Sequence, residues 1–234
     1  VWRVKDPHLS YNSRARGLAA AMEAWKLLTS GTGFFSLPSA PLVAFLKTRH
    51  DLATPNIQLH LLPIAVRSLQ KRELFDFPAM TISCYQLRPE SQGSIHVRSI
   101  NPHVPPAIKF NFLSDGIDQH CMVEGFKIVR RIGEQRALDS YRGEEVVPGA
   151  PVQTEAEILD FIRQNSQTAY HPIGTCRMGP VGPSTVVDDK LKVHGIAGLR
   201  VADASIFPNM PSGNTNAPSI MVGERAADFI KETP

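Results

Sequence analysis

The stretch Tyr170-His171-Pro172-Ile173-Gly174-Thr175-Cys176-Arg177-Met178-Gly179 opens the part of the chain that decides its interpretation. Further along come Val187-Asp188, Leu199-Arg200-Val201-Ala202, Asp203-Ala204-Ser205 and Ser212-Gly213-Asn214-Thr215-Asn216-Ala217-Pro218. A titratable histidine, several glycine turns, a strand-like run and a polar loop thus lie close together in the sequence. Special backbone positions gathered around a titratable group are typical of a chemical site. We therefore expect the site here and a scaffold elsewhere.

This tract resembles the C-terminal signature of the glucose–methanol–choline (GMC) family of flavin-dependent alcohol oxidoreductases. The matching positions include His171, Gly174, Thr175, Cys176, Met178, Gly179, Val193, Gly195, Pro208 and the run 213–218, which looks like that of choline-dehydrogenase-like bacterial members. A weaker likeness extends upstream over 88–93 and 101–112, although Gln92 stands where arginine is common in the family. The resemblance implies FAD as the cofactor and an alcohol as the substrate.

The composition is that of an ordinary globular protein, with 234 residues, 42% hydrophobic and 20% charged. The formal net charge of +3, without a long run of lysine or arginine, does not indicate a nucleic-acid partner. No apolar stretch approaches the roughly 18 residues that a membrane helix needs. We expect a soluble protein without a transmembrane segment and favour the cytoplasm, with the compartment itself left open.

The three cysteines, Cys84, Cys121 and Cys176, are odd in number and widely spaced. This pattern excludes a complete disulfide framework and favours reduced thiols. The histidines show no metal-ligand spacing, so no metal is expected. The chain starts at Val1 and reads there like the middle of a longer sequence. By the resemblance, the N-terminal half with the glycine-rich FAD-binding turn is absent from this chain.

Periodicity predicts an α+β fold with a mostly antiparallel sheet and packed helices. Alternation of apolar and polar residues predicts strands with one face solvated or facing a cavity, at 57–61, 81–85, 94–98 and 108–112. Helix formers, a capping box at 154–157 and a proline suited to a first turn predict helices at 16–28, 115–135, from 154 onward and at 218–231. A run from Leu199 to Ala202 is expected to be a further strand.

Gly31-Thr32-Gly33-Phe34-Phe35-Ser36 imitates a dinucleotide-binding fingerprint. It follows a predicted helix rather than a strand, lacks the third glycine and leads into Pro38. We therefore interpret it as a turn. The composition changes near Gln164-Asn165-Ser166 toward glycine, proline and short β runs. We assign residues 1–165 to a substrate-binding domain and 166–234 to a C-terminal catalytic segment that, by the resemblance, returns to the FAD-binding domain.

Oxidation of an alcohol needs a hydride acceptor, which must be a cofactor, and a base near neutral pH, for which histidine is suited. The resemblance makes His171 the catalytic base. Asn214 stands at the family's second position, where its amide would bind the substrate hydroxyl. A lone histidine before proline can also be structural, and an asparagine beside glycine can simply form a turn. Both residues at the family spacing favour the catalytic interpretation.

The resemblance assigns cofactor contacts to Asp203 and Ala204, at the end of the predicted strand, and to Thr215, Asn216, Ala217 and Pro218, at the start of the last helix. The positive end of that helix would stabilise the charge that builds on the flavin. Tyr170 is expected to line the substrate pocket, with packing in the core as the alternative.

The predicted function is FAD-dependent oxidation of a primary alcohol to an aldehyde, with a small-molecule alcohol as substrate and oxygen or another electron acceptor. The N-terminal FAD-binding half is the expected partner. The alternative is a non-catalytic isolated domain, inactive without that half. A serine hydrolase built on Ser205, His171 and Asp203 is disfavoured, because the sequence contains no G-x-S-x-G motif.

Overall fold

The structure is a computed structural model that describes residues 1–38, 40–68, 71 and 73–232. Two compact units are present, Val1–Gln86 with His120–Asn165 and Leu87–Gln119 with Ser166–Pro234. All named strands pair antiparallel and helices accompany them, so the predicted α+β class is confirmed. Residues 87–119 group with the C-terminal segment, which the sequence did not indicate. The assignment of 1–165 to a substrate-binding domain stays a prediction.

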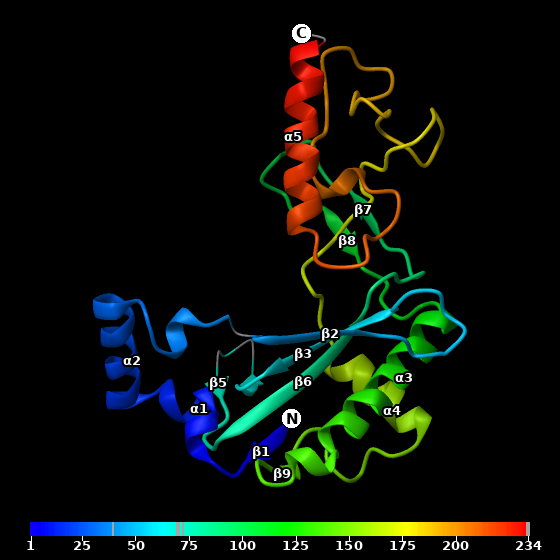
Figure 1. The fold of residues 1–234 in the computed structure, drawn as a ribbon. Coiled ribbons are helices and arrows are strands. Elements are labelled where there is room, and N and C mark those ends of the chain that lie inside the picture. The colour runs from blue at the N-terminus through cyan, green and yellow to red at the C-terminus, as the bar shows by residue number, and fades with distance from the viewer. Residues whose placement is uncertain (39, 69–70, 72, 233–234) are drawn as a thin grey trace. The chain divides into compact units, whose positions relative to one another are not determined.

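A five-stranded antiparallel sheet forms the framework of the first unit (Figure 1). Its order is β2 (Leu42–Leu46), β3 (Ile57–Leu62), β6 (Ala79–Gln86), β1 (Trp2–Val4) and β9 (Arg142–Glu145). The strands predicted at 57–61 and 81–85 are β3 and β6, which pair in register from Ile57↔Gln86 to Leu62↔Thr81. β1, β2 and β9 were not expected.

The two faces of this sheet differ in polarity, because alternate residues of a strand point to opposite sides. Leu59 of β3 and Ile82 of β6 belong to the apolar core. On the other face, the His60 Nε2 lies 2.8 Å from the Gln58 Nε2, and its ring makes an edge contact with Tyr85. Burial lowers the pKa of His60. The alternation read from the sequence therefore separates an apolar face from a polar one.

Helix α3 (Gly116–Gly133), predicted at 115–135, packs on the apolar face at positions where glycine permits a close approach. A Cβ at Gly125 would lie 3.2 Å from the Sγ of Cys84. At Gly133 it would lie 2.5 Å from the ring of Trp2, which is only 2% exposed. The helix therefore fits the sheet because it lacks side chains at two contact points.

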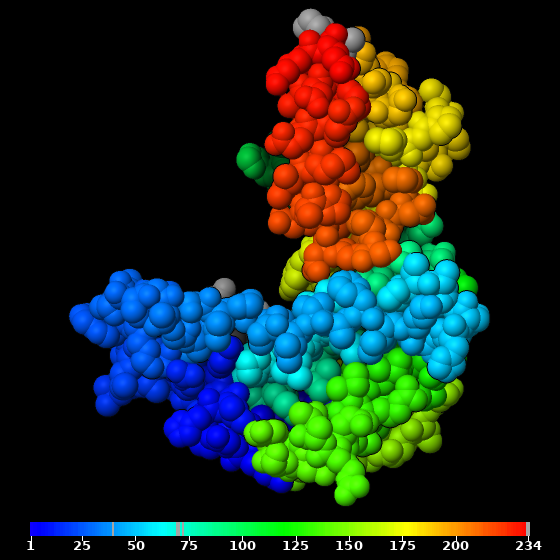
Figure 2. Space-filling model, viewed as in Figure 1, coloured from blue at the N-terminus to red at the C-terminus, as the bar shows by residue number. Residues whose placement is uncertain are grey.

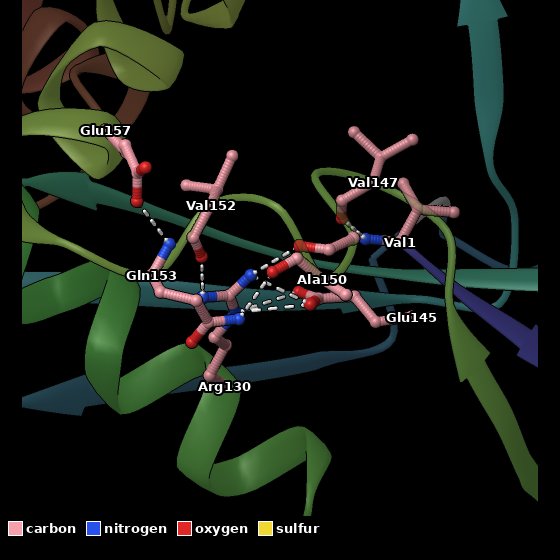
Figure 3. Close-up of polar contacts among 9 residues, drawn as sticks. Val1, Arg130, Glu145, Val147, Ala150, Val152, Gln153 and Glu157 are labelled. Atoms are coloured by element: carbon pink, nitrogen blue, oxygen red, sulfur yellow. Dashed lines mark hydrogen bonds and ion pairs between the residues drawn. The ribbon is translucent and has the colours of Figure 1, made fainter.

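Polar contacts tie α3 to the segment that leads into α4 (Glu155–Asn165), as Figure 3 shows. The Arg130 guanidinium donates to the Glu145 carboxylate at 2.9 Å and to the Gly149 carbonyl at 3.0 Å, and it also donates to the Val152 carbonyl. Only 13% of the Arg130 side chain is exposed, so these acceptors compensate for the desolvation of its charge.

The capping box predicted at the start of α4 is present. The Glu157 carboxylate accepts the Thr154 N–H at 2.8 Å, and the Glu157 N–H donates to the Thr154 Oγ1 at 3.3 Å. Two N–H groups near the beginning of the helix thereby obtain partners.

Helix α2 (Gly17–Ser30) ends at Gly31, whose φ of 66° is left-handed. The Glu23 carboxylate reaches the following turn and accepts the Phe34 N–H at 2.9 Å. Gly33 has a φ of 93°, and a Cβ there would lie only 2.6 Å from the Glu23 Oε2. These glycines end a helix and admit a carboxylate, so the interpretation as a turn is confirmed.

The second unit combines a short hairpin with a long helix. The strands predicted at 94–98 and 108–112 are shorter than expected, as β7 (Ser94–His96) and β8 (Ala107–Lys109). Helix α5 (Asn216–Glu232) begins two residues before the predicted start. Its buried face lies against the segment that precedes it, drawn in yellow and orange in Figure 2, through Val222, Ala226 and Phe229.

The strand predicted at 199–202 is wrong. Within the described residues this segment makes only an isolated bridge between Lys192 and Arg200. Gly195 and Gly198, with φ of 75° and 74°, turn the chain just before it, so the run is too short to pair as a strand. A 3-10 helix, η4 (Ala204–Ile206), follows directly.

The remaining elements are short: η1 (Pro7–Leu9), α1 (Tyr11–Arg14), η2 (Phe34–Ser36), β4 (Val66–Ser68), β5 (Glu73–Leu74) and η3 (Arg136–Leu138). β4 and β5 form a two-stranded sheet. The three cysteines are free thiols, as predicted, and burial together with the neighbouring Cys121 raises the pKa of Cys84 to about 12. Among the described helices, none has both the length and the apolar character to cross a bilayer.

The buried carboxylate of Glu23 should make stability depend on pH. Hydrogen bonds from Lys26, the Phe34 N–H and Arg14 lower the pKa of Glu23 from 4.5 to about 2. A depressed pKa contributes stability that is complete above about pH 4.5 and is lost as the pH falls toward 2. We expect Glu23→Gln to lower the Tm at pH 7, by a margin that shrinks between pH 4.5 and 2. Glu144→Gln, at an exposed ion pair, is the control. A difference in Tm between Glu23→Gln and the wild type that stays constant with pH would contradict the lowered pKa of Glu23.

The contact between Gly133 and Trp2 predicts a cost of overpacking. Gly133→Ala should lower the free energy of unfolding by about 1–3 kcal/mol, since the buried indole must shift. Gly116→Ala, on the same helix and with nothing within 4 Å of the added Cβ, should change it by less than about 0.5 kcal/mol. Urea unfolding followed by tryptophan fluorescence measures both. Equal effects of the two substitutions would mean that α3 and β1 do not approach each other this closely at Gly133 and Trp2.

Candidate active site

Two side chains from distant loops meet in the second unit. The Nδ2 of Asn214 lies 2.7 Å from the Nε2 of His171, although the residues are 43 positions apart. His171 is half-buried and Asn214 is exposed. The catalytic interpretation required this convergence, and the structure contains it. The roles of base and hydroxyl binder stay predictions.

Backbone hydrogen bonds fix the loops that carry these side chains. The Cys176 N–H donates to the Ser205 carbonyl at 3.0 Å, and the Met178 N–H donates to the Ile206 carbonyl at 2.8 Å. Val187, which is fully buried, packs beneath them in a cluster with residues of α5. Backbone hydrogen bonds and a buried apolar cluster therefore hold this irregular tract in place.

Thr215 contacts the other nitrogen of the His171 ring. Its Oγ1 lies 2.9 Å from the Nδ1 of His171, and the residue is only 8% exposed. The sequence assigned Thr215 to cofactor binding and did not anticipate this contact. The only hint of this contact in the sequence is that Thr215 directly follows Asn214, which was itself expected to lie near His171.

Asn216, Ala217 and Pro218 form the first turn of α5. The first hydrogen bond of the helix runs from the Ser219 N–H to the Thr215 carbonyl, at 3.0 Å. N–H groups in the first turn of a helix have no acceptor within that helix, and Pro218 has no backbone N–H group at all. The N–H groups of Asn216 and Ala217 therefore lie at the positive end of the helix, two and three residues after Asn214. Their contact with the cofactor stays a prediction.

Asp203 has a structural partner that the sequence did not indicate. Its carboxylate accepts the Ser205 N–H at 2.8 Å and caps η4. The expected strand does not continue past Asp203, because the chain turns into η4 at Ala204. A serine hydrolase still finds no support, since both ring nitrogens of His171 contact residues other than Ser205. The cofactor contacts of Asp203 and Ala204 stay predictions.

Tyr170 precedes His171 with an unusual backbone. Its φ is 61°, in the left-handed region that costs a residue other than glycine about 1–3 kcal/mol. The Tyr170 N–H donates to the Thr168 Oγ1 at 2.9 Å, which helps to hold this conformation. Since 73% of the residue is exposed, its side chain is not packed in the core of this unit. Its place in a pocket wall stays a prediction.

A hollow of about 270 Å³ lies elsewhere in this unit. It is lined by apolar residues of η4 and α5 and by their neighbours, including Ile206, Phe207, Met221 and Phe229. His171, Asn214 and Tyr170 do not line it. The hollow is therefore not the place where the predicted base would meet a substrate.

The cap on η4 can be tested by stability. Asp203→Ala should lower the free energy of unfolding of the second unit by about 0.5–2 kcal/mol, because the Ser205 N–H loses its acceptor. Asp203→Asn should retain most of this stability, since an amide oxygen can also accept. Thermal unfolding of the chain gives the measurement, with Asp189→Ala as a control. If Asp203→Ala matches that control, the side chain does not act as a cap.

Comparison with known proteins places this geometry in a family. Residues 89–223 match the model of the GMC oxidoreductase family. An oxygen-dependent choline dehydrogenase of Brucella ovis is 42% identical over 211 residues, which cover 88% of this chain and 37% of that protein. The counterpart in Chromohalobacter salexigens is 40% identical over 87% of this chain and 36% of its own length. The chain thus spans little more than a third of the relatives it matches.

Solved structures agree with this likeness. Pyridoxine 4-oxidase from Mesorbium loti superposes with a TM-score of 0.76 and 27% identity, over 84% of this chain and 38% of that one. A variant of Aspergillus oryzae RIB40 formate oxidase, described for its effect on FAD modification, gives a TM-score of 0.83 and 25% identity over 99% of this chain and 45% of that one. The chain therefore belongs to the GMC family of flavin-dependent oxidoreductases, whose cofactor is FAD.

Proposed function

We propose that this chain is the catalytic C-terminal part of an FAD-dependent enzyme that oxidises a primary alcohol to an aldehyde. The 2.7 Å contact between His171 and Asn214 carries the proposal, because it puts a nitrogen base and an amide donor beside one another. Family membership and the names of the relatives support the reaction class. Since the chain spans about 37% of those relatives, the whole activity needs a further, FAD-binding part.

The residues beside the pair suit a flavin. The first turn of α5 offers the N–H groups of Asn216 and Ala217 at the positive end of a 17-residue helix. Such donors favour a ring system that becomes negatively charged. When bound, FAD supplies the hydride acceptor that no side chain can provide.

The chain's own residues would act on the alcohol oxygen. An oxygen that contacts both atoms of the pair gives its proton to the Nε2 of His171 and accepts a hydrogen bond from the Nδ2 of Asn214. As the O–H bond breaks, the amide donor stabilises the negative charge on oxygen. The C–H electron pair then leaves with the hydrogen, the C=O bond forms, and the proton remains on the imidazole.

Apolar side chains on the surface of the second unit support docking of an FAD-binding part. α5 exposes Ile220, Met221 and Ile230, and the residues at and beside β7 and β8 expose a further group, Ile95, Ile108, Phe110 and Phe112. The rings of Phe110 and Phe112 stack with their centres 5.0 Å apart. Exposed apolar side chains of this kind are typical of an interface.

The relatives' names suggest the substrate class. The two bacterial relatives are choline dehydrogenases, and choline is a primary alcohol. We therefore propose choline as the first alcohol to assay. Other small primary alcohols fit the same pair, because His171 and Asn214 act only on the hydroxyl group.

The roles can be tested in the enzyme that joins this chain to its FAD-binding part. His171→Ala should slow flavin reduction by about 100- to 10,000-fold, as expected for loss of a general base. Asn214→Ala should slow it by about 100- to 1,000-fold, as for loss of one donor to a developing oxyanion. Anaerobic stopped-flow absorbance of the flavin gives the rate constants.

The control is His103→Ala, an exposed histidine of the 101–106 loop, which should leave the rate constant unchanged. Flavin absorbance that survives desalting must be equal in all variants, so that a loss of rate is not a loss of cofactor. Near-normal reduction in His171→Ala would reject the role of this residue. If the enzyme retains FAD but none of the alcohols tested reduces the flavin, the non-catalytic alternative would be favoured.

A further inference from the structure

The hydrogen bonds around the His171 ring determine which nitrogen carries the proton. A neutral imidazole has one N–H donor and one acceptor, and the partners of the two nitrogens decide between them. The Nδ2 of Asn214 is an amide nitrogen and can only donate, so at 2.7 Å it needs the lone pair of the Nε2 of His171. The ring proton must then be on Nδ1.

Thr215 supplies the acceptor that this arrangement requires. Its hydroxyl oxygen lies 2.9 Å from Nδ1 and can accept the Nδ1–H. The Thr215 backbone N–H also points to Nδ1, and as a donor it would need a lone pair on that nitrogen. At 3.5 Å, however, this contact is at the limit of a hydrogen bond. The two shorter contacts are mutually consistent and outweigh the longer one.

We propose that Thr215 is a positioning residue that holds His171 in the Nδ1–H form and thereby keeps the lone pair on Nε2. There it accepts from Asn214 in this structure, and a substrate hydroxyl would take the place of that contact. This rests on the proposed function for its consequence in catalysis. The tautomer itself is a property of the chain alone. Free histidine in water prefers the opposite form, with the proton on Nε2, so the site must work against an intrinsic preference.

The surroundings of Thr215 make it suitable for this task. The residue is buried, and its carbonyl accepts the Ser219 N–H and the Ser219 hydroxyl, at 3.0 and 2.7 Å. It therefore stands at the cap position of α5, whose buried face is packed in the core of the unit. A β-branched side chain in such a place has little freedom at χ1. The hydroxyl is thus presented to His171 from a fixed point.

His194 provides an internal reference of the opposite kind. Its Nε2 lies 3.0 Å from the carbonyl oxygen of Gly179, which can only accept. Neutral His194 must therefore carry its proton on Nε2. The two histidines of the same unit should give opposite tautomers in one spectrum.

The test is a long-range ¹⁵N–¹H correlation spectrum of the whole 234-residue chain, uniformly labelled, at a pH where imidazoles are neutral. His171→Gln and His194→Gln assign the two sets of signals. We expect the wild type to show His171 mainly with the proton on Nδ1. Thr215→Val, which keeps the shape and removes the oxygen, should shift His171 to mainly Nε2–H. Thr215→Ser should restore the wild-type pattern.

Thr185→Val is the matched control, because Thr185 also donates a hydrogen bond in this unit, to the Pro180 carbonyl, and does not contact His171. It should leave both histidines unchanged. Backbone amide spectra report whether each variant is folded. Wild-type His171 with its proton on Nε2, or a folded Thr215→Val that keeps it on Nδ1, would overturn the proposal.

Kinetics in the complete enzyme separate this proposal from the function on which it rests. Thr215→Val should slow flavin reduction by about tenfold, less than the roughly 100- to 10,000-fold of a lost base, since the imidazole remains. Thr215→Ser should recover most of the rate, with little change in KM for either variant. If His171→Ala reduces flavin normally, the proposed function fails whatever the spectrum shows. If His171→Ala is inactive and Thr215→Val keeps both tautomer and rate, only the positioning role fails.

Discussion

Two backbone hydrogen bonds, from Cys176 to Ser205 and from Met178 to Ile206, are the constraint on which the candidate site depends. They join the segment that follows His171 to the segment that leads toward Asn214. Neither segment is a regular helix or strand along most of its length, so neither could fix a side chain alone. Gly174, with a φ of 79°, gives the turn that lets the two run together. Convergence of the imidazole and the amide is a consequence of this junction.

How far the sequence predicts the fold depends on the length and contrast of each local pattern. α3 and α4 have many apolar positions at helical spacing, and α4 also begins with a capping box, so the sequence predicts both helices. β3 and β6 alternate over enough residues to be recognised. β1 has three residues and β9 reads Arg-Gly-Glu-Glu, so neither shows a strand pattern by itself. β9 is set in place by its pairing with β1 and by the ion pair of Glu145 with Arg130, which are both long-range.

The site divides in the same way. His171 and Asn214 were predicted because the family resemblance fixes both at once, and a lone histidine or asparagine would not have been chosen. Asp203 and Thr215 were assigned to the cofactor, whereas their side chains have partners within the chain. Asp203 caps a 3-10 helix, which could be recognised only once the expected strand at 199–202 was known to be absent. Threonine beside a helix start reads as an ordinary cap, and nothing local reveals that its hydroxyl faces a histidine 44 residues away.

Thr215 connects helix packing to ring orientation. Its carbonyl begins the hydrogen-bond ladder of α5, while its hydroxyl meets the Nδ1 of His171. The helix is in turn held by Val222, Ala226 and Phe229, which pack against Val187 and Ile206. Ile206 also receives one of the two backbone hydrogen bonds that anchor the loop of His171. His171 and Thr215 are therefore both anchored to one apolar cluster, His171 through its loop and Thr215 through α5. These contacts explain how a half-buried histidine and an exposed asparagine can keep a hydrogen-bond geometry without a rigid sheet beneath them.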